Sequence, residues 1–208
     1  MNYKIFLFIH ITSLLLAKSS FPTYTVADSL PENMPIIKSF LWGKDGSLRN
    51  TLFDPNNRIK ELEIRHQMLQ LHQKVALFTL GCMLYQYKLG KSMEGNSYTD
   101  YSEEERQKHM NLGYLTFGSY MSSASLSIFC PPGMKYPKRN KITNMNIHRY
   151  LATIHFTGMI LQPYIGYQAS IAGLEGRSLD RQNLLDYHNT IGSITTISYI
   201  LSFLTTLF

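Results

Sequence analysis

Residues 148–174 read HRYLATIHFTGMILQPYIGYQASIAGL, and this stretch decides the predicted fold. After Arg149 it continues to Leu174 without an Asp, Glu, Lys or Arg. An uncharged run of roughly 18 or more residues is the usual mark of a membrane-spanning helix. Residues 109–134 and 187–208 share this property. A shorter run, 75–87, becomes long enough if the lysines beside it extend their ammonium groups to the interfaces.

These runs predict an all-α membrane protein, a four-helix transmembrane bundle with spans near 70–90, 108–130, 145–171 and 186–207. Short loops between the spans make consecutive helices antiparallel neighbours. The sequence therefore indicates one transmembrane domain over residues 66–208.

The N-terminal part reads as a secretory signal and a tail. Residues 1–19 have a basic start, an apolar centre and small residues before a cleavage point. Residues 20–65 then form a short extracytoplasmic tail, in which 36–42 is suited to an interfacial helix. An uncleaved signal would add a fifth span.

The predicted location is integral and multi-pass, in a bacterial inner or other energy-coupling membrane with the tail outside. The loop at 131–146 carries four Lys and Arg and the loop at 172–185 carries two, which favours the opposite orientation. We follow the signal, because the first segment usually dominates.

A histidine begins each predicted span. His72, His109, His148 and His188 are separated by 37, 39 and 40 residues. An imidazole can ligate a haem iron. A residue four positions later lies on the same helix face, where a flat macrocycle needs room. A small residue stands at each of these positions: Ala76, Gly113, Ala152 and Gly192.

The alternating helix directions predict two ligand pairs. His72 and His148 lie near one face of the bundle, and His109 and His188 lie near the other. Two bis-histidine sites indicate two haem groups, of the non-covalent b type because no C-x-x-C-H motif is present. Lys108 and Arg149 flank ligands and are suited to pair haem propionates, or to ordinary interfacial snorkelling.

His155 competes with His148 as the ligand of the third span. It lies seven residues further on and therefore shares a face with His148. Met159, not a small residue, stands four positions after it. His155 is also suited to donate a hydrogen bond to a carbonyl or a tyrosine. His66 precedes the first span and is expected to be solvated or interfacial.

The predicted function is that of a di-haem b-type cytochrome that transfers electrons across the membrane. Its donor and acceptor are unknown, with a quinol or a redox protein as candidates, and whether it is an enzyme stays open.

The net charge of +6 suits the lipid bilayer surface, while no basic and aromatic constellation favours nucleic acid. A homodimer or a complex subunit is open. The alternative is a haem-free four-helix membrane scaffold or transporter subunit that binds a partner protein.

Residues 66–208 resemble the cytochrome b561 family. The third span is similar to that family's third core helix, in which a histidine and a small residue are followed by Gln and Gly, here His148, Ala152, Gln162 and Gly166. The Y-H-N-T-I-G segment resembles the family's final ligand segment, whose histidine corresponds to His188. His109 and His72 suit the ligand positions of the second and first helices. The resemblance implies a four-helix core with the first and third, and the second and fourth, histidines paired on haem. The family's ascorbate-binding motif and its additional spans have no counterpart here.

Overall fold

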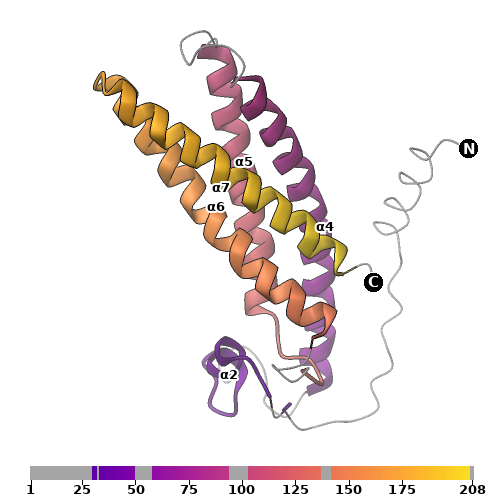
Figure 1. Cartoon of the computed structure of the whole chain (residues 1–208). Coiled ribbons are helices and arrows are strands. Elements are labelled where there is room, and N and C mark those ends of the chain that lie inside the picture. Colours follow the sequence, from indigo (N-terminus) through magenta and orange to yellow (C-terminus); the bar gives the residue numbers. More distant parts are fainter. Residues whose placement is uncertain (1–29, 32, 50–57, 94–102, 137–141, 207–208) are drawn as a thin grey trace, which may run out of the picture. The chain divides into compact units, whose positions relative to one another are not determined.

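The computed structural model describes residues 30–31, 33–49, 58–93, 103–136 and 142–206. Its helices are α2 (Ile36–Trp42), α4 (Arg58–Ser92), α5 (Glu103–Phe129), α6 (Asn144–Leu174) and α7 (Ser178–Leu204), as Figure 1 shows. No strand occurs within these described ranges. The expected short helix at 36–42 is α2, whereas the expected signal at 1–19 lies outside the described residues.

The chain divides into two compact units. The first comprises residues 1–74 and 124–136, and the second comprises residues 75–123 and 137–208. The long helices α4 and α5 therefore each contribute to both units. The first and second units are described separately below.

In the first unit, α2 closes the carboxyl end of α5. Lys38 Nζ lies 3.0 Å from the carbonyl oxygen of Ser127 and 2.9 Å from that of Ile128, and it donates to both. Trp42 Nε1 donates to the carbonyl oxygen of Phe129 at 3.1 Å. The last carbonyls of a helix have no partner within the helix, and the negative end of its dipole favours a cation. One lysine therefore both satisfies these carbonyls and neutralises the helix end.

A buried ion cluster holds the segment after α5 against α4. Glu61 is fully buried, with Arg49 Nε 3.1 Å from one carboxylate oxygen and Arg58 2.5 Å from the other. Arg58 also donates to the carbonyl oxygen of Pro132 at 2.8 Å. A buried carboxylate is tolerated only when opposite charge and hydrogen bonds replace its water. The two arginines meet this requirement.

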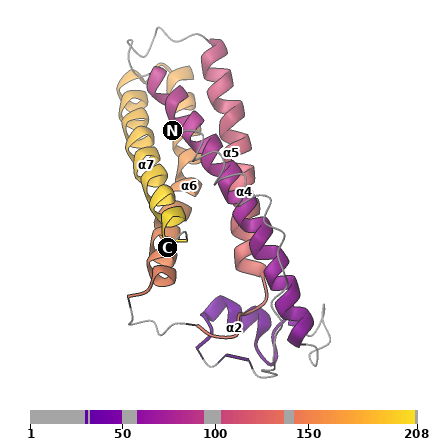
Figure 2. The ribbon, with the colours of Figure 1, turned by 90° about the vertical axis from the view of Figure 1, so that its right-hand side faces the viewer.

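In the second unit, α6 and α7 pack side by side as an antiparallel hairpin, which Figures 1 and 2 both show. Thr143 caps the start of α6, accepting a bond from the Asn146 N–H at 3.2 Å. Gly176 turns the chain between the helices with a φ of 72°, a conformation that glycine adopts readily. The helices come closest at Gly158, where an added Cβ would lie 1.9 Å from Thr195 Oγ1.

Polar bonds join the remaining neighbours in the second unit. Thr79 of α4 donates to Ser119 of α5 at 3.0 Å. Tyr120 of α5 lies 2.7 Å from Nδ1 of His155 on α6. Tyr199 of α7 donates to the carbonyl oxygen of Ala76 on α4 at 2.9 Å. The core of this unit is thus unusually polar, and each buried hydroxyl has a partner.

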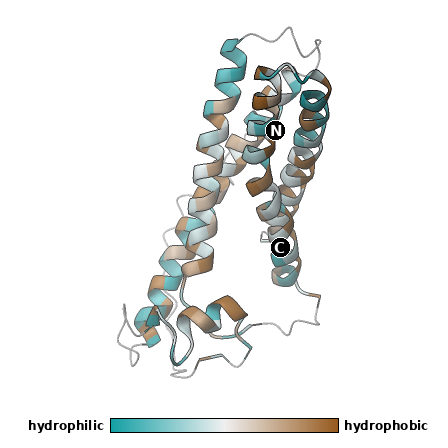
Figure 3. Ribbon diagram, turned by 90° about the vertical axis from the view of Figure 1, so that its left-hand side faces the viewer, coloured by the Kyte–Doolittle hydropathy of each residue, from teal (hydrophilic) through white to brown (hydrophobic). Residues whose placement is uncertain are grey.

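The predicted transmembrane bundle is wrong. Among the described helices, none combines the length and the apolar character needed to cross a membrane. Figure 3 shows hydrophilic and intermediate residues interspersed with hydrophobic ones along each helix. The error came from treating absence of charge as apolarity: α5 after His109 is rich in Ser, Thr, Gly and Tyr. The expectation of an integral, multi-pass location in an energy-coupling membrane is contradicted by the same finding.

The close crossing at Gly158 predicts a stability effect. Gly158→Ala should lower the free energy of unfolding by about 1–3 kcal/mol, because the new methyl group overlaps Thr195. Gly81→Ala is the matched control: nothing lies within 4 Å of its added Cβ, so the helix gains about 0.5–1 kcal/mol. Thermal or denaturant unfolding measures both. Equal effects of the two substitutions would contradict the close packing of α6 on α7.

Candidate functional site

His109 and His188 come together in the second unit. They belong to α5 and α7, and their ring centroids are 6.2 Å apart with 66° between the ring planes. The Nδ1 atom of each ring is buried and has no hydrogen-bond partner among the described residues. Buried polar atoms are normally paired. Two neighbouring rings, each with an unpartnered nitrogen, therefore mark this pair as a candidate ligand site.

Each histidine is contacted by a glutamine from the preceding helix. Gln86 Nε2 lies 3.1 Å from His109 Nε2 and donates to the carbonyl oxygen of His109 at 2.9 Å. Gln162 Nε2 donates to the carbonyl oxygen of His188 at 2.8 Å. The Oε1 atom of Gln86 is also buried without a partner in the described part of the chain. Sequence reasoning missed Gln86.

Two glycines leave room for the rings. A Cβ at Gly90 would lie 3.4 Å from Cε1 of His109, and a Cβ at Gly166 would lie 3.3 Å from Cε1 of His188. These glycines stand on the helices opposite the histidines, on α4 and α6. The small residues predicted beside the ligands, Gly113 and Gly192, lie instead against the two glutamines.

Burial keeps both imidazoles neutral. Desolvation, with a smaller contribution from the nearby His188, lowers the pKa of His109 from 6.5 to about 4. Desolvation also lowers the pKa of His188, against an opposing effect of the Gln162 hydrogen bond. Both rings are therefore uncharged at neutral pH and each has one lone pair, and that of His109 accepts the N–H of the Gln86 amide through Nε2.

The helix pairs α4–α5 and α6–α7 carry the same residues at the same spacings. From His72 in α4 and from His148 in α6, identical residues recur after 4, 11, 14 and 18 positions. From His109 in α5 and from His188 in α7, they recur after 4, 7, 10, 11 and 14 positions. The shared residues are Ala76/Ala152, Met83/Met159, Gln86/Gln162, Gly90/Gly166, Gly113/Gly192, Thr116/Thr195, Ser119/Ser198, Tyr120/Tyr199 and Ser123/Ser202. The four predicted ligands are thus two pairs of equivalent residues.

His155 lies in a buried aromatic cluster instead of beside an open site. Tyr120 OH contacts its Nδ1 at 2.7 Å, and the ring of Tyr199 lies 4.9 Å from it between centroids. Burial raises the pKa of both tyrosines. The partner of His155 is therefore a tyrosine, one of the roles expected for it.

His148 has its Nδ1 atom 3.0 Å from the carbonyl oxygen and 2.9 Å from the hydroxyl of Ser202. A bond from Nδ1–H to a carbonyl leaves Nε2 with the lone pair, as in many metal-binding histidines. His72 belongs to the first unit and His148 to the second. Their predicted pairing stays a prediction.

The remaining predicted site residues have other contacts. Lys108 is exposed and pairs with Glu104 at 2.6 Å, a surface ion pair within α5. Arg149 donates to Asn146 Oδ1 at 3.3 Å. Their predicted role at haem propionates is not supported by these contacts. The Ala76 carbonyl accepts the bond from Tyr199.

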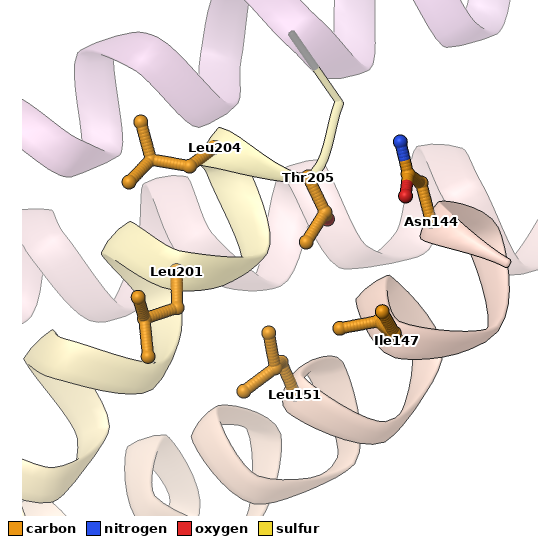
Figure 4. Close-up of a pocket in the computed structure, with 6 residues that line it drawn as sticks. All are labelled: Asn144, Ile147, Leu151, Leu201, Leu204 and Thr205. Atoms are coloured by element: carbon orange, nitrogen blue, oxygen red, sulfur yellow. The ribbon is translucent and has the colours of Figure 1, made fainter. Parts of the chain in front are cut away.

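An apolar pocket of about 430 Å³ lies between the start of α6 and the end of α7. Figure 4 shows its lining residues, Asn144, Ile147, Leu151, Leu201, Leu204 and Thr205. This lining offers no acid, base or nucleophile, so the pocket suits packing of an apolar group and not catalysis.

The expectation of a metal-binding protein is contradicted for the described residues. In them, no three His, Cys, Asp or Glu side chains gather closely enough to hold a metal ion. His109 and His188 form a pair, and two ligands are too few for a closed metal-ion site. The structure thus gives no support to a metal centre built from protein ligands alone.

The low pKa of His109 predicts acid sensitivity of the haem-free chain. The unfolded state takes up a proton near pH 6.5 and the folded state only near pH 4, so stability is full above pH 6.5 and falls as the pH drops towards 4. The loss amounts to about 3 kcal/mol at most. Unfolding measured against pH should show a shallower fall for His109→Gln, and an unchanged slope would contradict the assignment.

The Tyr120 bond to His155 predicts a second stability effect. Tyr120→Phe should cost about 1–3 kcal/mol, because it removes the hydroxyl that pairs with a buried imidazole nitrogen. Tyr114→Phe, on the same helix but 66% exposed, should be nearly neutral. Chemical unfolding of both variants measures the difference, and a neutral Tyr120→Phe would show that the bond contributes nothing.

No family model, no curated protein and no solved structure matches this chain. The resemblance to the cytochrome b561 family accordingly stays a prediction.

Proposed function

We propose that the second unit binds a non-covalent b-type haem between His109 and His188 and carries single electrons. The observation that carries this proposal is the neighbouring pair of neutral imidazoles, 6.2 Å apart between centroids, whose buried Nδ1 atoms have no partner in the described structure.

A haem fits a two-histidine site better than a metal ion does. A haem would bring most of the ligands of its iron itself, so the protein would need to supply few. His109 and His188 would be enough to hold it, whereas a closed ion site needs about four protein ligands. The glycines opposite the rings, Gly90 and Gly166, keep side chains away from the imidazoles.

When bound, the haem supplies one-electron chemistry. The chain's own residues hold the two rings in place through the glutamines, keep them unprotonated by burial, and shield them from water. No proton transfer to a substrate is needed for this task. The donor and the acceptor, a quinol or a redox protein, remain predictions.

The sequence also predicts a second haem, at His72 and His148. The two residues are equivalent in the two hairpins, as His109 and His188 are. The Ser202 contacts of His148 resemble the hydrogen bonds that orient metal-binding imidazoles. His72 and His148 belong to different units, so the second haem stays a prediction from the sequence.

Replacing a ligand tests the first site. His109→Ala and His188→Ala should each remove about one haem per chain and its low-spin b-type absorption band, because an axial ligand is lost. His66→Ala is the matched control, since His66 bonds to Gln70 in the first unit. Haem content and reduced-minus-oxidised spectra measure the outcome.

Full haem content and an unaltered spectrum in both ligand variants would refute the site. A colourless wild-type chain prepared with ample haem would favour the other reading, a haem-free helical scaffold for a partner protein.

A further inference from the structure

We infer that Gln86 and Gln162 are equivalent positioning residues that fix the orientation of His109 and His188. The inference rests on the proposed function for its redox consequence, but the contacts themselves are features of the fold.

Each glutamine makes the same bond in its own hairpin. Gln86 Nε2 reaches the carbonyl oxygen of His109 at 2.9 Å, and Gln162 Nε2 reaches that of His188 at 2.8 Å. In an α-helix this carbonyl already accepts the N–H four residues later. The glutamine therefore donates a second hydrogen bond to a carbonyl that is already paired within the helix.

Glycines make the arrangement reciprocal. A Cβ at Gly113 would lie 3.2 Å from Gln86 Nε2, and a Cβ at Gly192 would lie 3.4 Å from Gln162 Oε1. Each glutamine thus lies over a glycine of the histidine's helix. Each histidine in turn lies over a glycine, Gly90 or Gly166, that is four residues after the glutamine.

These reciprocal contacts limit how far α5 and α7, the helices that carry the histidines, can rotate or slide. Rotation of α5 would break the Gln86 bond and move the His109 ring off Gly90. The same holds for α7 with Gln162 and Gly166. Because protein interiors are close-packed, the neighbouring side chains cannot adjust to such displacements in small steps.

The recurrence of the arrangement argues against coincidence. The two hairpins differ at most positions, and Gln86 and Gln162 are followed by Tyr87 and Pro163. The glutamine, both glycines and the histidine are nevertheless the same in each. Because all four residues are the same in both hairpins, we infer that they share one role. Their contacts indicate that this role is to position the histidine ring.

The copies also differ in one respect. Gln86 lies 3.1 Å from the His109 ring nitrogen Nε2, whereas Gln162 bonds to the backbone of His188. Gln86 is thus placed to act on the ring and its tautomer directly. Gln162 acts on His188 through the helix.

The test uses Gln86→Met and Gln162→Met in the full-length chain. Methionine keeps the approximate length and flexibility of glutamine and removes the amide donor. The matched control is Gln107→Met, because Gln107 is exposed on α5 and donates to Asn111 of the same helix. Unfolding curves verify that the variants are folded.

The first readout is imidazole nitrogen NMR of the haem-free chain. We expect Gln86→Met to shift the His109 signals and Gln162→Met to shift the His188 signals, with the larger tautomer change at His109. Gln107→Met should shift neither. Unchanged His109 and His188 signals in both variants would overturn the positioning role.

The second readout is the low-spin electron paramagnetic resonance signal and the midpoint potential of the haem-loaded chain. Both depend on axial ligand orientation and the surroundings of the ligands. We expect both to shift in the two glutamine variants while haem remains bound. A bound haem with an unchanged signal and potential would overturn the inference. A colourless wild-type chain whose histidine signals still shift would overturn the proposed function and leave the positioning contacts standing.

Discussion

The second unit depends on keeping two imidazole rings away from water, although not every ring nitrogen has a hydrogen-bond partner in place of water. The rings of His109 and His188 lie side by side in a T-shaped arrangement, and the Nδ1 atom of each is buried and unpaired in the described structure. Leaving a buried polar atom unpaired destabilises a fold by about 1–3 kcal/mol. A site that bears this penalty twice is explained if a ligand supplies the missing partner, which is the basis of the haem proposal.

The surrounding structure is arranged to hold that pair. The glutamine bonds to the histidine carbonyls fix the helices on which the rings stand. The close crossing at Gly158 sets the distance between α7 and α6, the helix that carries Gln162. In the centre of the unit, Tyr120 and Tyr199 occupy equivalent positions, and each bonds towards the other hairpin, to His155 and to Ala76. The hairpins are thereby joined by polar bonds in a core that contains few large aliphatic side chains.

Much of the helical layout could be predicted from sequence, because the uncharged runs and the turn residues between them mark the helices. The membrane prediction was wrong because those runs owe their lack of charge to Ser, Thr, Tyr and Gly as much as to aliphatic residues. The pairing of His109 with His188 followed from helix direction, and the two residues do lie together. The role of Gln86 was missed, although aligning 72–90 with 148–166 would have revealed it. No local pattern could show that Lys108 pairs with Glu104 instead of a ligand, since that choice depends on side-chain geometry.

The most direct test of the central claim is the reduced-minus-oxidised absorption spectrum of the wild-type full-length chain, purified under haem-replete conditions, with haem per chain quantified. The account predicts a sharp low-spin b-type band and at least one haem group per chain. A colourless protein would contradict it, and would require another partner for the unpaired nitrogens of His109 and His188.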